Sequence, residues 1–264
     1  MLNLKHISMT FNEGTLDEKR ALKSINLNLK QGEFVTVIGG NGAGKSTLMN
    51  VISGTLMADV GDIIINQKPV HQLPEFKRSR YIGRVFQDPM AGTAPEMTIE
   101  ENLAIAYSRN KKRSLRLGVT KNRREIFKTY LKTLNLGLEN RLNAKVGLLS
   151  GGERQALSLL MATFTEPDIL LLDEHTAALD PARAELITEL TTDIVKRFGL
   201  TTLMVTHNMQ QAVDMGDRLI MMDAGEIILD VSGEEKSKLT IEQLLKEFQR
   251  IRGEQLVTDQ TVLG

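Results

Sequence analysis

The sequence of 264 residues contains no cysteine. This absence excludes disulfide bonds, zinc sites built on thiolates and cysteine nucleophiles, and it leaves the redox compartment open. Long hydrophobic runs are also missing, since no window approaches the roughly 18–20 apolar residues that cross a bilayer. Residues 1–30 lack the apolar segment of a signal peptide, so we expect the chain to stay in the cytoplasm. A role in transport would need another chain to supply the membrane path.

The chain also lacks an excess of either charge. Its 33 Lys and Arg residues balance its 33 Asp and Glu residues, so no global field attracts the protein to nucleic acid or to a membrane. Hydrophobic residues make up 41% of the chain, which is ordinary for a globular protein. The length allows one large α/β domain or two small ones.

The stretch from Gly39 to Ser46 fits the pattern G-x-x-x-x-G-K-[ST] of a phosphate-binding loop. Residues 34–38 before it have the composition of a short buried strand, and residues 46–52 begin a helical pattern. A strand, a glycine loop and a helix N-terminus direct backbone N–H groups and the helix dipole at an anion. We expect Lys45 to reach the β- and γ-phosphates and Ser46 to ligate Mg²⁺. The alternative is a glycine-rich turn before a helix, and the strand, lysine and hydroxyl together favour the phosphate site.

A second apolar run, residues 169–172, ends in Asp173 and Glu174. Such a run is typical of a parallel strand buried on both faces, and α/β proteins bind ligands at the C-terminal ends of these strands. We expect Asp173 to hold Mg²⁺ through water and Glu174 to take a proton from the attacking water. The alternative is a buried strand that ends in solvated acids, and the phosphate loop favours the catalytic interpretation.

Strand and helix patterns in the rest of the chain predict an α/β fold. Residues 2–10 and 24–29 alternate apolar and polar side chains, as half-buried strands do, whereas residues 201–206 read as a buried strand. Residues 181–198 lie between the two buried strands and are helical in pattern, with Asp180 as the N-cap. Strand–helix–strand units of this kind imply a parallel sheet with right-handed crossovers.

Two further segments have clear local patterns. Residues 98–142 follow helical spacing, and residues 217–230 read as a hairpin that turns near Gly225. Near the C-terminus, Thr240 and Gln243 make a capping-box pattern. One helical face then collects the apolar residues Ile241, Leu244, Leu245, Phe248 and Ile251.

A third motif, Leu149–Gln155, places two glycines at the start of a helical run. Taken alone, Ser-Gly-Gly is more often a loop and helix cap than a binding site. Here, however, the motif lies between a phosphate loop and an acidic strand. With this placement the chain resembles the ATP-binding subunit of ABC transporters, because Leu149–Gln155 matches the signature motif of that family. The other family motifs appear in order: Gln87 matches the Q-loop, Asp180 the D-loop and His207 the switch histidine.

The resemblance covers about residues 1–235 and implies the architecture. It predicts a P-loop NTPase (RecA-like) core with a mostly parallel sheet, an N-terminal antiparallel β subdomain and an inserted helical subdomain at about residues 89–157. The ABC ATPase domain is expected over residues 1–238, followed by an amphipathic helix and tail over residues 239–264.

The resemblance also implies how the site works. Two nucleotide-binding domains pair head to tail, and each ATP lies between the P-loop of one chain and Ser150, Gly151 and Gly152 of the other. Binding of ATP closes the dimer and hydrolysis reopens it. Gln87 would sense Mg²⁺ or water and connect the site to the membrane partner, and His207 would hydrogen-bond the γ-phosphate.

Residue by residue, the resemblance assigns three groups of contacts. Glu174, His207 and Gln87 are the expected catalytic residues. An aromatic residue usually stacks on the adenine, and Phe11 is the candidate, although a plain core phenylalanine is the alternative. The expected ATP contacts are Phe11, Gly39, Gly40, Asn41, Gly42, Ala43, Gly44, Lys45, Ser46, Thr47, Ser150, Gly151, Gly152 and Asp180, and the expected metal contacts are Ser46, Gln87 and Asp173.

One residue beside the acids departs from the family pattern. His175 follows Glu174 where the family usually has proline. Because both acids are intact, we expect His175→Pro to change ATPase activity by less than about tenfold.

A basic stretch falls within the expected helical subdomain and contains no acid: Arg109, Lys111, Lys112, Arg113, Arg116, Lys121, Arg123 and Arg124. The plain interpretation is a solvated loop and helix face. The alternative is contact with anionic lipid headgroups, where each cation would add ~1 kcal/mol.

The function that fits these motifs is an ATPase that powers transport through separate permease subunits at the cytoplasmic face of the membrane. Residues 10–14, 20–22 and 109–124 resemble those of ATPases encoded beside a periplasmic- or lipoprotein-type binding protein and a permease of the branched-chain-amino-acid kind. This resemblance implies an importer, with amino acids as the expected cargo. The expected partners are a second copy of the chain, an integral-membrane permease and an extracytoplasmic substrate-binding protein, with no nucleic acid. The alternatives are an exporter ATPase, or a non-transport ABC ATPase acting on nucleic acid or in translation, which tends to carry coiled coils, zinc cysteines or tandem ATPase domains.

Overall fold

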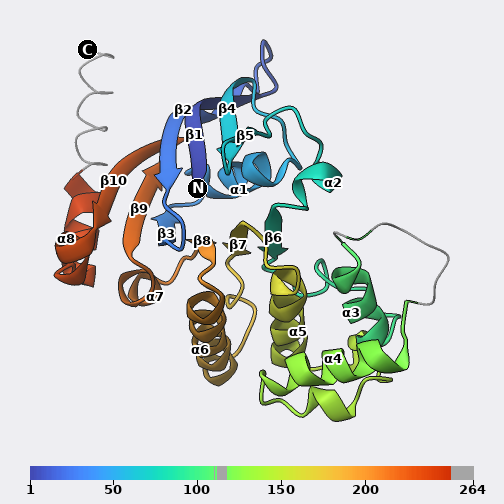
Figure 1. The fold of residues 1–264 in the computed structure, drawn as a ribbon. Coiled ribbons are helices and arrows are strands. Elements are labelled where there is room, and N and C mark those ends of the chain that lie inside the picture. The colour runs from blue at the N-terminus through green and yellow to red at the C-terminus, as the bar shows by residue number, and fades with distance from the viewer. Residues whose placement is uncertain (110, 112–117, 251–264) are drawn as a thin grey trace, which may run out of the picture.

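The computed structural model describes residues 1–109, 111 and 118–250 (Figure 1). The strands are β1 (Leu2–Phe11), β2 (Lys19–Leu29), β3 (Phe34–Gly39), β4 (Val60–Ile65), β5 (Lys68–Pro69), β6 (Ile82–Val85), β7 (Ile169–Asp173), β8 (Thr201–Val205), β9 (Arg218–Asp223) and β10 (Glu226–Ser232). The α-helices are α1 (Lys45–Ser53), α2 (Glu75–Arg78), α3 (Ile99–Tyr107), α4 (Lys121–Lys132), α5 (Gly151–Thr163), α6 (Pro181–Phe198), α7 (Met209–Asp214) and α8 (Gly233–Ser237). Residues 241–250 are also helical, and two short 3₁₀ turns, Leu138–Asn140 and Val146–Leu148, precede α5.

The strands form two sheets. The N-terminal sheet has the order β2-β1-β4-β5 and is antiparallel throughout. The second sheet has the order β10-β9-β3-β8-β7-β6, and only its edge strand β10 is antiparallel to its neighbour. Every residue of β8 and all but the last of β7 are buried, as expected for parallel strands covered on both faces. The predicted α/β architecture with a mostly parallel core sheet is confirmed.

Strand β2 begins earlier than its alternating pattern predicts. The pattern starts at Ser24, whereas the strand starts at Lys19, because its first residues pair with the end of β1. The paired residues include Phe11 with Lys19 and Met9 with Leu22. Charged residues at its start hide this extension in the sequence, and it carries Lys19 to the glycine loop.

A buried arginine anchors the C-terminal end of α1, the helix that follows the glycine loop. Arg78 is 0% exposed. Its guanidinium donates hydrogen bonds to the carbonyls of Val51 at 2.6 Å and Ile52 at 3.2 Å, in the last turn of α1. It also donates to the carbonyls of Leu73 and His71, at 2.7 and 2.6 Å. A cation at a helix C-terminus is favoured by the helix dipole, so Arg78 stabilises α1 and the loop in front of it.

Helices α3 and α4 form a lobe that stands apart from the two sheets, with α5 running from the core sheet into it (Figure 1). Three aromatic rings join the helices of this lobe edge to face. The ring centre of Tyr107 on α3 lies 6.0 Å from that of Phe127 on α4 and 5.4 Å from that of Phe164, the residue after α5. Such pairs add about 0.5–1.5 kcal/mol each beyond the area they bury.

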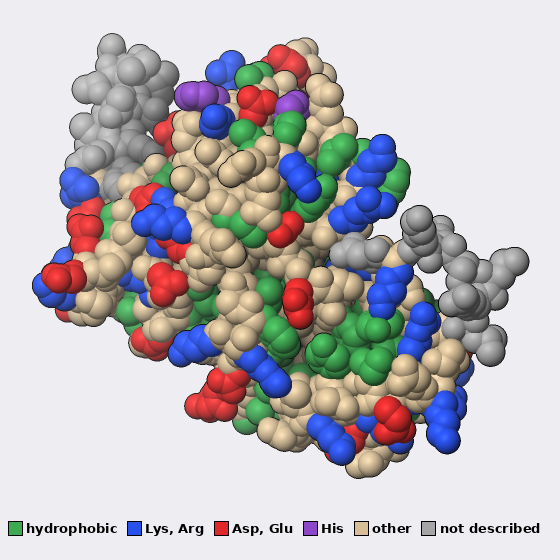
Figure 2. Space-filling view, viewed as in Figure 1, with side chains coloured by type: hydrophobic (Ala, Val, Ile, Leu, Met, Phe, Trp, Pro, Cys, Tyr) green, Lys and Arg blue, Asp and Glu red, His purple; other side chains and the backbone are tan. Residues whose placement is uncertain are grey.

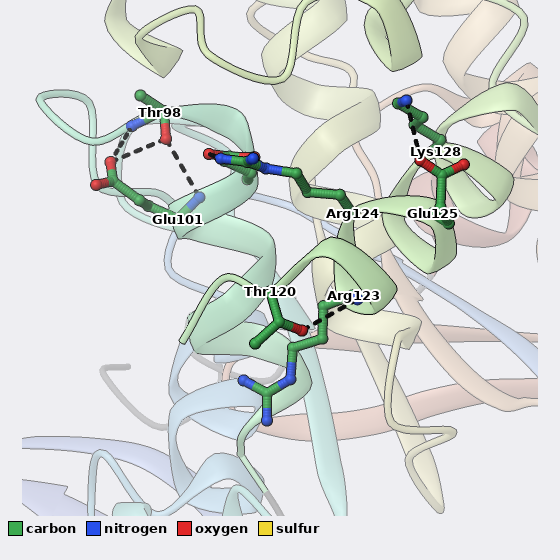
Figure 3. A network of polar contacts seen from close by, with 8 residues as sticks. Thr98, Glu101, Thr120, Arg123, Arg124, Glu125 and Lys128 are labelled. Carbon is green, nitrogen blue, oxygen red and sulfur yellow. Dashed lines mark hydrogen bonds and ion pairs between the residues drawn. The ribbon is translucent and has the colours of Figure 1, made fainter. Parts of the chain in front are cut away.

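Part of the basic stretch also holds this helical lobe together. Arg124 on α4 donates to both carboxylate oxygens of Glu100 on α3, at 2.6 and 2.8 Å, and this bond raises the pKa of Arg124. Figure 3 shows Arg124 extending from α4 toward the helix turn that carries Glu101. Arg123 donates to the carbonyl of Gly118 at 2.6 Å. Arg124 thus joins α4 to α3 through its pair with Glu100. Lys112, Arg113 and Arg116 lie outside the described residues.

The C-terminal helical segment packs on the edge of the core sheet. The Thr240 N–H donates to Gln243 Oε1 at 2.9 Å, and the Gln243 N–H donates to Thr240 Oγ1 at 3.3 Å, so the capping box is present. Leu244 is fully buried in a cluster with residues of β9 and β10. Within the described part of the chain, no helix combines the length and apolar composition needed to cross a membrane.

Candidate nucleotide-binding site

The glycine loop between β3 and α1 lies against two neighbouring strands. Gly39 and Gly44 have backbone φ values of 155° and 100°. A Cβ at Gly39 would lie 2.2 Å from the Met222 carbonyl oxygen, and a Cβ at Gly44 would lie 2.6 Å from the Ala21 carbonyl oxygen. Any other residue at either position would push the loop away from these strands, so the glycines are needed for its shape.

Lys45 is held inside this loop and is 5% exposed. Its Nζ donates to the carbonyls of Gly39 at 2.8 Å and Gly40 at 3.0 Å. Burial lowers the pKa of Lys45, while the nearby carboxylates of Glu174 and Asp173 act in the opposite direction. The ammonium is thus fixed in the loop without a direct carboxylate partner among the described residues, which leaves its charge to attract an anion.

A cavity of about 300 Å³ opens beside the loop. It is lined by Phe11, Lys19, Ala21, Asn41, Gly42, Ala43, Gly44, Lys45, Ser46, Thr47, Glu174 and His207. Loop amides, a buried lysine, a hydroxyl and an aromatic ring at one wall are the groups that a nucleoside triphosphate needs. The cavity residues therefore fit ATP.

Lys19 is a cavity residue that the motifs do not reveal. Its Nζ lies 3.6 Å from the place that a Cβ on Gly42 would occupy, and it stands opposite Phe11 in the strand register. It adds a second cation to the wall of the cavity. Lys19 could have been found only by extending β2 to residues before its alternating pattern, and the pairing with β1 is what shows this extension.

The expected base and the switch histidine meet at the ends of adjacent strands. Strands β7 and β8 are parallel, and Asp173 pairs with Val205 in their register, so Glu174 and His207 emerge at the same edge. Glu174 Oε1 and His207 Nε2 are 2.5 Å apart. Glu174 has a φ of 46°, and its N–H donates to the Val205 carbonyl at 3.0 Å. This turn directs the carboxylate into the cavity.

Other expected site residues lie away from the cavity in this chain. Asp173 forms an ion pair with Arg84, and Gln87 is exposed on the loop after β6. Ser150 caps α5, since its hydroxyl accepts from the Glu153 N–H at 3.3 Å. None of the residues Gln87, Ser150, Gly151, Gly152, Asp173 and Asp180 lines the cavity beside the loop.

The glycines that open α5 pack instead on the segment at the start of α6. A Cβ at Gly151 would lie 3.4 Å from Leu179, and a Cβ at Gly152 would lie 3.2 Å from Arg183. Asp180 caps α6 by accepting from the Arg183 N–H at 3.2 Å. The start of α5 and the start of α6 therefore form one continuous surface in this chain.

A glutamine behind the site connects the segments that carry Glu174 and His207. Thr206 donates to Gln211 Oε1 at 2.7 Å. Gln211 Nε2 donates to Thr188 on α6 at 3.0 Å and to Thr176 at 3.4 Å. The motifs did not identify Gln211, because its contacts come from three separate elements.

His175 points away from the cavity and into the core. It is 2% exposed, and its Nε2 lies 3.0 Å from Thr191 Oγ1. The Thr191 hydroxyl already donates to the Ile187 carbonyl at 2.7 Å, so it accepts the Nε2 proton of a neutral imidazole. Burial lowers the pKa of His175 to about 4.

This environment predicts a pH dependence of stability. The pKa of His175 is lower in the folded state than in the unfolded state. Its contribution to the free energy of unfolding is therefore complete above about pH 6.5 and is lost as pH falls toward 4. From this group alone, the free energy of unfolding should fall by about 3 kcal/mol over that range. Urea unfolding of the wild type and of His175→Gln at pH 7 and pH 4.5 measures the difference. An equal fall in both proteins would contradict the prediction.

Comparisons with known proteins agree with this geometry. A profile of the ABC transporter family matches residues 22–177. A protein of Clostridioides difficile (strain R20291) named tyrosine transport ATP-binding protein is 43% identical over 249 residues, which is 94% of this chain and 99% of the relative. The range matched by the family profile contains the glycine loop, the start of α5 and the acidic end of β7.

Solved structures give the same result. A dimeric ATP-binding cassette in a post-hydrolysis state bound to ADP and Pi is 31% identical, with a TM-score of 0.75, and the match covers 88% of this chain and 98% of that chain. The cbiO1 protein from Clostridium perfringens, part of the ABC transporter complex cbiONQ, is 27% identical with a TM-score of 0.75, and that match covers 97% and 98% of the two chains.

Proposed function

This chain belongs to the ABC transporter family, and from that premise we propose that it is the ATP-hydrolysing subunit of an importer for amino acids. Family membership makes it an ATP-binding ATPase that powers transport. The observation that supports the cargo is the relative named for tyrosine transport, which matches nearly the whole chain.

The proposed chemistry assigns tasks to cavity residues of the site and to Asp173 beside the cavity. Lys45 and the loop amides bind the phosphates, and Phe11 stacks on the adenine. Glu174 accepts a proton from the attacking water. His207, whose Nε2 lies 2.5 Å from Glu174 Oε1, orients that carboxylate and is the proposed hydrogen-bond partner of the γ-phosphate. Ser46 and Asp173 supply the oxygen ligands that suit Mg²⁺, which when bound neutralises charge on the phosphates.

We further propose that the site is completed by a second copy of the chain. Ser150, Gly151 and Gly152 lie outside the cavity in their own chain and are left for another chain's ATP. The match to a dimeric cassette bound to ADP and Pi supports this arrangement.

The proposed membrane partner is a permease at the cytoplasmic face, working with an extracytoplasmic substrate-binding protein. Hydrophobic side chains gather on the face of the molecule beside the helical lobe (Figure 2). Among the exposed large hydrophobic residues of the described chain, Met90, Ile105 and Leu148 belong to the segment between β6 and α5, which includes the helical lobe. Exposed apolar surface of this kind marks a protein interface.

Reconstitution tests the function. The chain should co-purify with an integral-membrane permease, and proteoliposomes of that complex with the substrate-binding protein should take up labelled tyrosine when ATP is supplied. The same complex carrying Glu174→Gln is the control and should not transport. Uptake that is absent with tyrosine and other amino acids, in a complex that still hydrolyses ATP, would contradict the proposed cargo.

A further inference from the structure

A partly buried ion pair lies beside the proposed metal site. Arg84 on β6 donates from Nη2 to Asp173 Oδ2 on β7 at 2.9 Å, and the two side chains are 12% and 15% exposed. The parallel register of the two strands explains the contact. Arg84 pairs with Leu171, two residues before Asp173, so Arg84 and Asp173 project from the same face of the sheet.

The guanidinium of Arg84 is held on two further sides. Its Nη1 donates to Ser53 Oγ at 3.2 Å, at the end of α1. Its Cζ lies 4.7 Å from the centre of the Phe86 ring, next to Gln87. An arginine held by a hydrogen bond and a ring keeps one orientation, so it binds the Asp173 carboxylate in one orientation as well.

We propose that Arg84 is a positioning residue that holds Asp173 through Oδ2, leaves Oδ1 for the divalent cation and weakens the affinity of the site for that cation. The inference rests on the proposed metal role of Asp173. Arg84 and the metal share the charge of one carboxylate, and two cations a few ångströms apart repel each other in a partly buried site. Arg84 therefore fixes the orientation of the Asp173 carboxylate and at the same time lowers the affinity of the site for the metal.

Nucleotide binding with and without metal tests this inference. Calorimetry on the full-length chain gives the Kd of AMP-PNP in Mg²⁺ and in EDTA. The Kd in EDTA divided by the Kd in Mg²⁺ reports how strongly the metal increases the affinity for the nucleotide. Arg84→Met should raise this ratio about tenfold. Arg84→Gln also removes the charge and should give the same rise, so it replaces the methionine variant if that protein is unstable.

Two controls separate charge from structure. Arg84→Lys retains the charge and should keep the ratio at the wild-type value. Arg197→Met removes an exposed arginine at the end of α6 and should change nothing. In ATPase assays, Arg84→Met should lower both the Mg²⁺ concentration at half activation and kcat. A ratio unchanged in folded Arg84→Met and Arg84→Gln would overturn the inference.

Asp173→Asn distinguishes this inference from the proposed site. If Asp173 binds the metal, the asparagine variant should bind AMP-PNP almost equally in Mg²⁺ and in EDTA. A wild-type ratio in that variant would contradict the metal role of Asp173 itself. A collapsed ratio in Asp173→Asn together with unchanged ratios in the Arg84 variants would remove only the role of Arg84.

Discussion

Glu174→Gln should reduce kcat for ATP hydrolysis by about two to four orders of magnitude while ATP binding is retained. Glutamine fills the same space beside His207 but cannot accept a proton from water. Because hydrolysis is the step that reopens the proposed dimer, ATP-bound dimers of this variant should accumulate. Single-turnover hydrolysis and size-exclusion chromatography with ATP measure the two effects.

Glu235→Gln is the matched control for this substitution. Glu235 is exposed on α8, in a part of the chain remote in sequence from the cavity residues. The same loss of charge there should leave kcat and the oligomeric state unchanged. Hydrolysis by Glu174→Gln at the wild-type rate would show that another group is the base.

Lys45→Ala should weaken ATP binding on the order of 100-fold, because a charge-assisted hydrogen bond to phosphate contributes about 3 kcal/mol. The structure agrees with this expectation, since the ammonium is held in the loop by the carbonyls of Gly39 and Gly40. Titration with a fluorescent ATP analogue gives the Kd. Lys196→Ala, an exposed lysine in the last turn of α6, is the control.

The two variants should therefore fail at different steps. Lys45→Ala should remain monomeric in ATP, because it does not load nucleotide, whereas Glu174→Gln should load nucleotide and stay closed. Tight ATP binding by folded Lys45→Ala would contradict the role of the glycine loop in phosphate binding.

Local sequence patterns predict the elements well where local interactions decide them. Helix α6 has the predicted bounds, Pro181–Phe198, because Asp180 caps it and Gly199 ends it in the left-handed conformation. The hairpin of β9 and β10 turns at Ala224 and Gly225, where both φ values are positive. Strand β2 is the exception, because its first residues are held by pairing with β1 and not by their own pattern.

The site residues also divide into those that local motifs predict and those that only the tertiary structure reveals. The loop, the acids and the histidine carry motifs, and the parallel order of β7 and β8 makes the meeting of Glu174 with His207 a consequence of the fold. Lys19 and Arg84 carry no motif. Their importance comes from the strand beside each of them, so only the tertiary structure reveals it.

The central claim is that the cavity is half of a site and that Ser150-Gly151-Gly152 of a second copy supplies the other half. Because the chain has no cysteine, one pair of introduced thiols reports this contact without interference. In the Glu174→Gln background, Asn41→Cys and Ser150→Cys chains should be mixed, given ATP and treated with a short bismaleimide crosslinker. The account predicts an ATP-dependent crosslink between the two chains that disappears when Lys45→Ala is added to the Asn41→Cys chain. Efficient closed-state ATP binding with no such crosslink would contradict it.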